Sequence, residues 1–272
     1  MHIQPTREEL IELTPLNPFD RFPDGRPKVP DSLLDRLTKT TTEQAWDVMR
    51  HQGYNFQFEG NWRESHPGRV TVGRAVTAQF LPYRPDFHAV IDKLGISEGR
   101  RGEHNSWVIE SLQHRDCMVV DIFGKVKEGS VVGDNLGTAV QVRTGTGAVI
   151  DGGIRDYQGL VRLNDVNFYF RDMDPTAIAN VTLAGLNIPI RIGKITVLPG
   201  DVILGTPTGV IAIPTHLAEL VAERSEDIAI RDRFSKIRLA EDKYASDEID
   251  VSVWREDIEA DFVEWRRKGD LD

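Results

Sequence analysis

Residues 133–156, GDNLGTAVQVRTGTGAVIDGGIRD, carry the strongest fold signal in the chain. The pattern predicts a helix over residues 134–143 and a short buried strand over residues 148–151. Glycines are expected to close the helix and then to turn the chain after the strand: Gly145, Gly147, Gly152 and Gly153. In an α/β layer the start of a helix and the end of the next strand lie at the same edge. We therefore expect Asp134 to converge with Arg155 and Asp156.

The groups that converge at this edge have complementary chemical uses. The carboxylates of Asp134 and Asp156 suit a hard divalent cation such as Mg²⁺. The free backbone N–H groups of Asn135 and Leu136, at the start of the helix, favour an anion. The planar guanidinium of Arg155 can grip a carboxylate or stabilise a developing enolate. Together these groups predict a pocket for a 2-oxo acid.

A purely structural interpretation of the same residues stays open at this point. An aspartate before a helix is a common N-cap, and neighbouring Arg and Asp residues often form a surface ion pair. The glycines can serve turns alone. Composition and spacing do not decide between the two interpretations.

Outward from this stretch, the patterns predict a mixed α/β domain. Strands are expected over residues 69–81, with Gly73 as a bulge or kink, and over 117–123, 188–192, 202–204 and 210–213. Helices are expected from about Thr41, capped by Thr40 or Thr41, to Gly53, and over residues 87–94 and about 215–243. Residues 107–112 are expected to end a further stretch that is helical or irregular. His104 and His114 flank this stretch and could line a pocket, although ordinary surface or core roles are favoured.

Composition excludes several classes of protein. The 272 residues are 40% hydrophobic and 28% charged, which is typical of a globular protein with a large core. A net charge of −10 without a Lys/Arg run disfavours nucleic-acid binding. Cys117 is the single cysteine, so an intramolecular disulfide is impossible. No apolar run approaches the roughly 20 residues that span a bilayer, and the start of the sequence is too polar for a signal peptide. We expect no membrane contact and a cytoplasmic location.

Both ends of the sequence differ from its middle. Residues 1–35 are rich in proline and predict an extended N-terminal arm that wraps over a neighbour. Residues 36–243 are expected to form the α/β domain, including the long C-terminal helix. Residues 244–272 form a tail, where isolated aromatics predict docking on another surface, such as another subunit: Trp254, Phe262 and Trp265.

Three motifs resemble those of the RraA-like family, and the two long ones come in the family's order. They are the stretch 133–156, the pair VLPGDV (197–202) and GVIAIP (209–214), and more weakly GRAVT (73–77). That family includes regulators of ribonuclease E activity and class II 4-hydroxy-4-methyl-2-oxoglutarate / 4-carboxy-4-hydroxy-2-oxoadipate aldolases. The resemblance covers about residues 38–231. It implies a swivelling β/β/α sandwich with N- and C-terminal extensions, assembled as a homotrimer or homohexamer with sites between subunits.

The resemblance also implies a role for each residue of the converging group. Asp156 matches the carboxylate that coordinates Mg²⁺ or Mn²⁺, and Asp134 matches the carboxylate that holds a metal-bound water. Arg155 matches the arginine that binds the 2-oxo acid and stabilises the enolate. The amides of Asn135 and Leu136 match those that hold the pyruvyl carboxylate.

Two features depart from the family pattern. An acid from a neighbour's C-terminal helix completes the site in aldolases of the family, and Glu226, Asp227 and Asp232 all lie near the expected place. The usual Asp-Asp-Gly before the last strand is Pro207-Thr208-Gly209 here. The second departure bears on the substrate more than on the metal.

The sequence therefore predicts a divalent-metal-dependent lyase that cleaves a 4-hydroxy-2-oxo acid by a retro-aldol reaction to pyruvate and a carbonyl product. Decarboxylation of oxaloacetate is expected as a side activity, because it needs the same enolate. Two alternatives stay open: a dehydratase or aldolase of a 2-oxo-3-deoxy sugar acid, and a non-catalytic regulator of ribonuclease activity.

Overall fold

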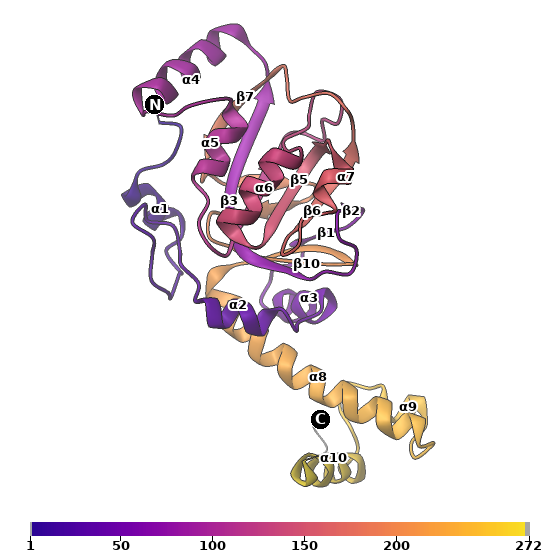
Figure 1. Cartoon of the computed structure of the whole chain (residues 1–272). Helices are drawn as coiled ribbons and strands as arrows, with labels where there is room; N and C mark the ends of the chain where they lie inside the picture. The colour runs from indigo at the N-terminus through magenta and orange to yellow at the C-terminus, as the bar shows by residue number, and fades with distance from the viewer. Residues whose placement is uncertain (1, 270–272) are drawn as a thin grey trace.

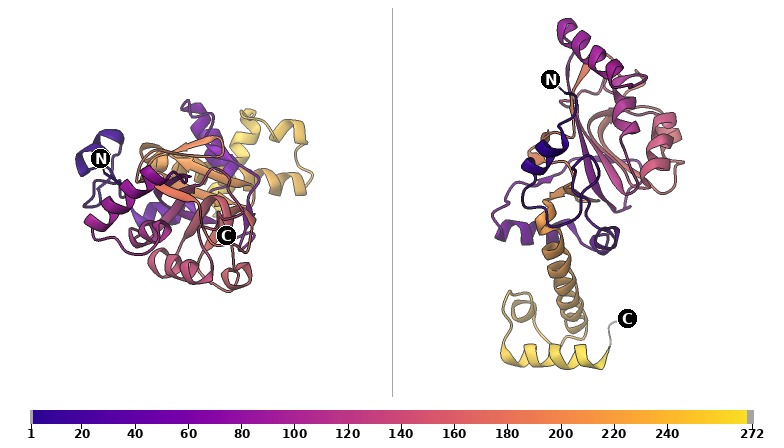
Figure 2. Two further views of the ribbon diagram at one scale, coloured as in Figure 1. Left: turned by 90° about the horizontal axis from the view of Figure 1, so that it is seen from above. Right: turned by 90° about the vertical axis from the view of Figure 1, so that its left-hand side faces the viewer.

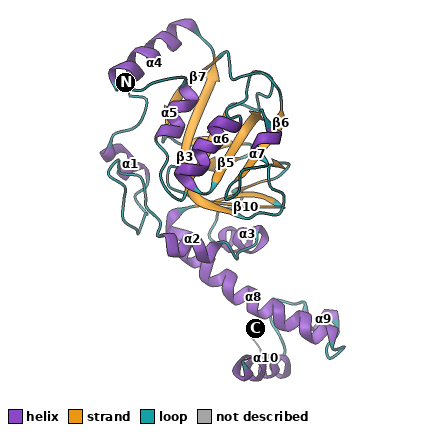
Figure 3. Ribbon diagram, in the orientation of Figure 1, coloured by secondary structure: helices purple, strands orange, loops and turns teal. Residues whose placement is uncertain are grey.

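The centre of the molecule is a nine-stranded, mixed sheet in the order β1-β11-β10-β3-β4-β5-β6-β2, with β7 paired to β3 (Figures 1 and 3). The computed structural model describes residues 2–269. Strands β3 to β6 run parallel, and β10 pairs antiparallel with β3. The strands of this sheet are β1 (Phe58–Glu59), β2 (Arg63–Glu64), β3 (Thr71–Pro82), β4 (Asp116–Asp121), β5 (Gly147–Ile154), β6 (Asn167–Met173), β7 (Val181–Leu186), β10 (Val202–Thr206) and β11 (Gly209–Ile213).

The central strands are buried on both faces, so their side chains alternate between two apolar cores. In β4, Met118 and Val120 pack against helices. Cys117 and Val119 point to the other face, where a second layer lies. That layer contains the hairpin of β8 (Ile190–Ile192) and β9 (Ile195–Val197), together with residues of β10 and β11.

The sheet curls until its outer strands face its middle. Ile203 of β10 and Val210 of β11 share a core with Val149 of β5. A Cβ on Gly205 of β10 would come within 2.6 Å of the Tyr169 ring in β6, although three strands separate the two positions in the sheet order. The result is two β layers, with helices against the central strands on one side and a second group of helices against β10 and β11, which confirms the expected mixed α/β fold.

The helices were largely placed by their periodicity. The helix expected from about Thr41 begins with a capping box, in which the side chains of Thr41 and Gln44 each accept a hydrogen bond from the other residue's backbone N–H. The bounds are α1 (Arg7–Leu13), α2 (Asp31–Leu37), α3 (Thr42–His51), α4 (Pro85–Ser97), α5 (His104–Glu110), α6 (Asp134–Thr144), α7 (Tyr157–Leu160), the 3₁₀ turn η1 (Thr215–Leu217), α8 (Ala218–Ala240), α9 (Ser246–Ile249) and α10 (Glu256–Lys268). Among the residues described, no helix combines the length and apolar character that a membrane span requires.

Two expectations about glycines were wrong. Gly152 and Gly153 do not turn the chain but lie inside β5, where side chains would collide with the 122–126 loop: a Cβ on Gly152 would lie 2.2 Å from Ile122 Cγ2. Gly73 causes no bulge, because it pairs in register with Ile203, and the irregularity of β3 falls between Gln79 and Phe80.

The N-terminal residues, expected as an extended arm, contain α1 and pack on their own chain. Ile3 and Leu10 are fully buried. Arg26 forms a buried, two-pronged ion pair with Asp116 at the start of β4, with both N–O distances 2.8 Å. Such a buried pair fixes the position of the segment, because removing either partner would leave an uncompensated charge in the core.

The C-terminal residues form a small helical unit of their own. Helix α8 leaves the body and carries α9 and α10 away from it (Figures 1 and 2). Phe234 of α8 is the centre of an aromatic cluster with Trp254, Phe262 and Trp265, all of which are buried. The prediction that these tail aromatics dock on another surface is therefore wrong, because they bury each other within the chain.

Candidate functional site

The structure brings Asp134, Arg155 and Asp156 to one edge of the sheet. Asp134 is the first residue of α6, and Arg155 and Asp156 directly follow β5. Gly133 makes the close approach possible: a Cβ there would lie 2.3 Å from Asp156 Oδ2 and 3.1 Å from Arg155 Nε. Asp134 packs against Gly159 in the same way: a Cβ on Gly159 would lie 2.5 Å from Asp134 Cβ. The three residues therefore lie together at one edge of the sheet, as the topology predicts.

Asp156 has an unusual backbone conformation. Its φ of 53° and ψ of 38° are left-handed, which costs a non-glycine residue free energy and is best tolerated by Asp and Asn. The Asp156 carbonyl nevertheless accepts from the Gly159 amide at 2.8 Å, and Arg155 N–H donates to the Val132 carbonyl at 3.1 Å. The turn therefore holds the carboxylate and the guanidinium side by side, with 3.4 Å between Arg155 Nε and Asp156 Oδ2.

Only one of the two amides expected to bind an anion is free of a partner. The Asn135 N–H donates to Asp134 Oδ1 at 2.8 Å. Within residues 2–269, the Leu136 N–H has no acceptor, as expected for the first turn of a helix. An anion at this helix start would therefore meet the Leu136 amide first, and the Asn135 amide only after the Asp134 carboxylate turns away.

These residues fit a hard divalent cation. Asp134 and Asp156 offer carboxylate oxygens at an exposed edge, and the missing side chain of Gly133 leaves space at Asp156 Oδ2. Mg²⁺ usually takes one or two protein carboxylates and keeps several waters, so a pair of acids is the donor set it needs. No third acid joins them: among residues 2–269, the one group of three His, Cys, Asp or Glu side chains close enough to share an ion is a different one.

The three acids of α8 lie elsewhere in this chain. Helix α8 follows β11, which ends opposite Val202 of β10. Val202 pairs with Arg74 near the start of β3, whereas Asp156 follows the end of the parallel strand β5, so the two lie at opposite edges of the sheet. Glu226 is held by Arg36, with N–O distances of 2.8 and 3.0 Å, and this hydrogen-bonded pairing lowers the pKa of its carboxyl. Asp227 and Asp232 are exposed.

The group that does cluster is His88, Asp92 and His104, whose ligand atoms all lie within 4.8 Å of one another. Its hydrogen bonds argue against a metal. His104 Nδ1 accepts from the Leu183 N–H at 3.1 Å, so the ring proton must be on Nε2, which faces Asp92 Oδ1 at 2.9 Å. A protonated nitrogen cannot ligate a cation. Burial also lowers the pKa of His104, which favours the neutral ring.

A cavity of about 550 Å³, here called the distal cavity, opens directly beside the converging residues. Gly133, Leu136 and Arg155 line one side of it. The remaining walls come from the ends of β3 and β7, from α4 and α5, and from the loop before β7. His104 lines this cavity, whereas His114 does not. Sequence reasoning missed the other wall residues, because no motif or spacing connects these distant segments.

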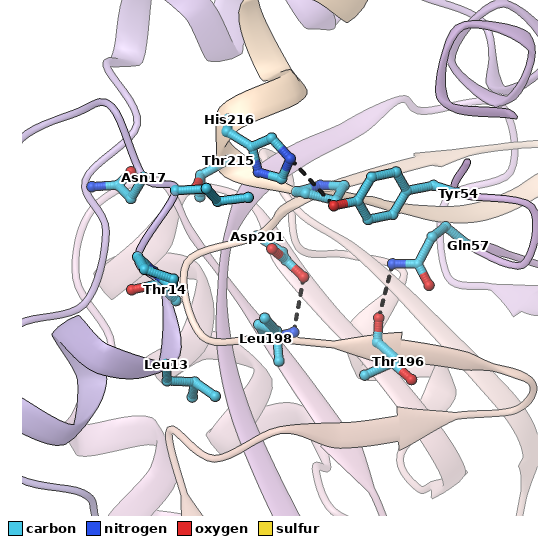
Figure 4. Close-up of a pocket in the computed structure, with 13 residues that line it drawn as sticks. Leu13, Thr14, Asn17, Tyr54, Gln57, Thr196, Leu198, Asp201, Thr215 and His216 are labelled. Carbon is cyan, nitrogen blue, oxygen red and sulfur yellow. Dashed lines mark hydrogen bonds between the residues drawn. The ribbon is translucent and has the colours of Figure 1, made fainter. Parts of the chain in front are cut away.

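A second cavity, of about 300 Å³, lies at the opposite edge of the sheet (Figure 4). Residues 13–17 cover it, and Tyr54 and His216 meet across it with 3.2 Å between the hydroxyl and Nε2. Asp201 reaches into this cavity from its buried position and accepts from the Leu198 N–H at 2.8 Å. The cavity is mostly apolar and lies far from Arg155 and Asp156, so we do not assign the chemistry to it.

Asp201 should make stability depend on pH. Burial raises the pKa of its carboxyl from 3.8 to about 7, so the folded protein binds this proton more tightly than the unfolded chain does. The contribution is full below about pH 4 and is lost as the pH rises through about 7. Asp201→Asn keeps an acceptor for Leu198 and never ionises. Its melting temperature relative to wild type should rise by on the order of 5 °C between pH 5 and pH 8. The exposed substitution Asp165→Asn should show no such trend, and a constant difference for Asp201→Asn would contradict the assignment.

Comparisons with known proteins bear on the family and the fold of this chain. A family model described as RraA-like, Aldolase/RraA, matches residues 41–212, which is more than half of the chain. A Halalkalibacterium halodurans protein provisionally named 4-hydroxy-4-methyl-2-oxoglutarate aldolase is 29% identical over 111 residues, covering 41% of this chain and 52% of that protein. Protein DlpA of Legionella pneumophila is 25% identical over 212 residues, covering 77% of this chain but only 31% of DlpA. The chain thus spans about half of the first relative and a third of the second.

A solved structure supports the fold. The Streptomyces coelicolor protein RraAS2, described as an unusual member of the RNase ES inhibitor RraA family, superposes with a TM-score of 0.65 at 24% identity. The match covers 81% of this chain and all of that one. At this identity the likeness establishes the architecture and leaves the activity to the residues of the site.

Proposed function

Because this chain belongs to the RraA-like family, we propose that it is one of the metal-dependent lyases of that family and cleaves a 4-hydroxy-2-oxo acid to pyruvate and a carbonyl product. The family also contains non-catalytic members. The observation that carries the proposal is the joint placement of Asp134, Arg155 and Asp156 at one exposed edge beside the distal cavity.

The proposed roles follow from what each group can do. Asp156 and Asp134 would hold Mg²⁺ or Mn²⁺, which when bound lowers the energy of an enolate by neutralising its charge. Arg155 directs its guanidinium at the 2-oxo end of the substrate, where negative charge develops. The Leu136 N–H, and the Asn135 N–H once released, are placed to hold the substrate carboxylate.

Cleavage then requires one broken bond and two proton transfers, since the C4 hydroxyl loses a proton and C3 later gains one from water. Asp134 accepts the C4 hydroxyl proton through a single water, and the C4–O bond becomes a carbonyl as the C3–C4 bond breaks. The bonding electron pair moves onto the pyruvate fragment as an enolate, which Arg155 stabilises until C3 is protonated. Decarboxylation of oxaloacetate forms the same enolate, so we expect it as a side activity.

We further propose that a second copy of the chain completes the site. Proteins of this family typically form trimers, and Asp134, Arg155 and Asp156 are all exposed in the single chain. If an acid of a neighbour's α8 reaches them, Asp227 and Asp232 are more available than Glu226, which Arg36 already holds. A cytoplasmic location also stays a prediction.

The direct test measures pyruvate release from a panel of 4-hydroxy-2-oxo acids and from oxaloacetate, with Mg²⁺ and with EDTA. Turnover that disappears on chelation supports the proposal. No turnover of any substrate, together with no Mg²⁺ or Mn²⁺ binding by calorimetry, rejects it and favours the non-catalytic regulator.

Gly133→Ala offers a structural test of the same site. The new Cβ would lie 2.3 Å from Asp156 Oδ2, yet the backbone of Gly133, with φ −118° and ψ −165°, is allowed for alanine. The variant should fold normally and lose on the order of 10- to 100-fold in kcat/KM, because the carboxylate is displaced. Gly60→Ala serves as the control, because a Cβ there would make an ordinary 3.5 Å contact with the Phe58 ring. Wild-type activity in Gly133→Ala would contradict the role given to Asp156.

A further inference from the structure

The second cavity, beneath residues 13–17, contains a buried carboxylate without a counter-charge. Asp201 is 4% exposed, and Figure 4 shows its side chain among the residues that line this cavity. One carboxylate oxygen, Oδ2, accepts from the Leu198 N–H at 2.8 Å. Among residues 2–269, the other oxygen, Oδ1, has no hydrogen-bond donor, and no cationic side chain forms an ion pair with it. A buried carboxylate is costly unless a positive or donating group compensates it.

A second acceptor without a donor lies in the segment that covers the cavity. Asn17 Nδ2 donates to the Phe19 carbonyl at 2.7 Å, whereas Asn17 Oδ1 is buried and has no donor in the described part of the chain. Nearly all buried polar atoms of folded proteins are hydrogen-bonded, so two such acceptors around one cavity need an explanation. The chemical group that complements them is one that donates.

The other polar groups of the wall are already paired with one another. The Tyr54 hydroxyl and His216 Nε2 lie 3.2 Å apart, and Gln57 Nε2 donates to the Thr196 carbonyl at 3.0 Å (Figure 4). An ordered water needs two to four polar partners, so the space that these pairs leave suits a carbon skeleton better than a group of waters. Leucines and prolines supply most of the remaining wall: Leu13, Pro15, Leu16, Leu198 and Pro214.

The cavity is formed before any ligand enters it. Arg21 fastens the cover, because its guanidinium donates to the Thr14 hydroxyl at 2.8 Å and to the Thr14 carbonyl at 2.7 Å. On the other side, the bond from Leu198 to Asp201 closes the turn that carries the carboxylate. A volume of about 300 Å³ is at the small end of the range for ligand pockets, so the ligand must be compact.

We propose that the second cavity is a binding site for a small primary amine, whose ammonium pairs with Asp201 while its apolar skeleton fills the space beneath residues 13–17. An ammonium has three N–H donors and no acceptor, so it complements a carboxylate and an amide oxygen. Charge-assisted hydrogen bonds are roughly twice as strong as neutral ones, which favours an ammonium over a hydroxyl on the same skeleton. The site lies at the opposite edge of the sheet from Arg155 and Asp156, so it does not depend on the proposed lyase chemistry.

The test compares three compounds of similar shape and different charge: 2-phenylethylamine, 2-phenylethanol and 3-phenylpropanoate. At pH 8, calorimetry on the full chain should give an affinity for the amine at least about tenfold higher than for the alcohol, and no binding of the carboxylate. Equal affinities for the amine and the alcohol would overturn the proposal. Binding of none of the three at millimolar concentration would overturn it as well, because water alone would then fill the cavity.

The pH dependence of amine binding identifies the partner. Burial raises the pKa of the Asp201 carboxyl to about 7 in the empty protein, so the carboxylate forms as the pH rises from 5 to 8. The affinity for the amine should increase by on the order of tenfold over this range, and the affinity for the alcohol should not change. The other titratable or charged groups around the cavity are Tyr54 and His216 in its wall and Arg21, which holds its cover. His216→Gln removes the imidazole and should leave the increase in place, whereas loss of the increase in this variant would assign the effect to His216.

Asp201→Asn tests the carboxylate itself. Asparagine keeps an acceptor for the Leu198 N–H but cannot ionise, so the affinity for the amine should fall to that of the alcohol and lose its pH dependence. Unchanged binding of 2-phenylethanol would show that the cavity of the variant is intact. Asp165→Asn, at an exposed acid, and Asp156→Asn, at the other edge of the sheet, should bind the amine as the wild type does. Full amine affinity in Asp201→Asn, or its loss in Asp156→Asn, would place the amine elsewhere and reject the proposal.

Discussion

Replacing Asp156 by asparagine should reduce metal-dependent turnover by on the order of 1,000-fold while the protein stays folded. Asparagine has the same shape and tolerates the left-handed backbone at φ 53°, so the variant removes one negative charge and little else. Mg²⁺ loses a carboxylate that would hold it directly, and binding measured by calorimetry should weaken in parallel with pyruvate release. Asparagine is preferable to alanine, which would add backbone strain at this position.

The chain offers a closely matched control for this substitution. Asp242, in the turn after α8, is also exposed and also left-handed, with φ 54°. Asp242→Asn therefore makes the same chemical change in the same backbone conformation but far from the sheet edge. It should retain wild-type activity and metal binding. If Asp156→Asn kept its metal affinity and its turnover, Asp156 would not be a metal ligand.

The core of the site was predictable because local patterns and topology agree there. A helix that begins at Asp134 and a buried strand that ends before Arg155 must meet at one edge, whatever the rest of the fold is. The left-handed conformation of Asp156 was not predictable, because the turn that imposes it depends on contacts with Gly133 and Gly159. The hydrogen bond that occupies the Asn135 amide was equally hidden in the sequence.

The walls of the distal cavity lay beyond sequence reasoning for a different reason. They come from segments about 50 to 100 residues apart, such as Tyr83 and Val181, which are joined only by the pairing of β3 with β7. Strand β7 is buried at five of its six positions, so its sequence shows no alternation of apolar and polar residues. The fixed tautomer of His104 likewise depends on a backbone amide of β7, at Leu183.

Aromatic residues in the tail show how a correct observation can lead to a wrong structure. Trp254, Phe262 and Trp265 are isolated from the main hydrophobic period, as the sequence indicated. Their partner is Phe234 of α8, a helix that the sequence analysis included in the α/β domain. Since α8 extends beyond the body, its far half supplies an apolar surface that only the tail can cover.

Arg155→Lys should be the second severe substitution, with a loss in kcat on the order of 10²- to 10³-fold. The positive charge is retained, but an ammonium cannot offer two parallel N–H donors to the 2-oxo end of the substrate. The loss should fall mainly on kcat, because charge at the enolate oxygen develops in the transition state and is small in the bound substrate. Steady-state kinetics on the preferred substrate, together with pyruvate C3–H exchange, would measure both effects.

Arg63→Lys is the matched control for this change. Arg63 is half-exposed, as Arg155 is, and it pairs with Asp172 at 2.8 Å, so the two substitutions disturb similar Arg–Asp pairs. Turnover should be unaffected in Arg63→Lys, since a surface ion pair contributes about 0–1 kcal/mol to stability and nothing to the site. If Arg155→Lys raised KM and left kcat unchanged, Arg155 would bind only the substrate carboxylate. The stabilisation of the enolate would then have to come from the metal held by Asp134 and Asp156, and the exchange of pyruvate C3 hydrogens would proceed at the wild-type rate once pyruvate was saturating.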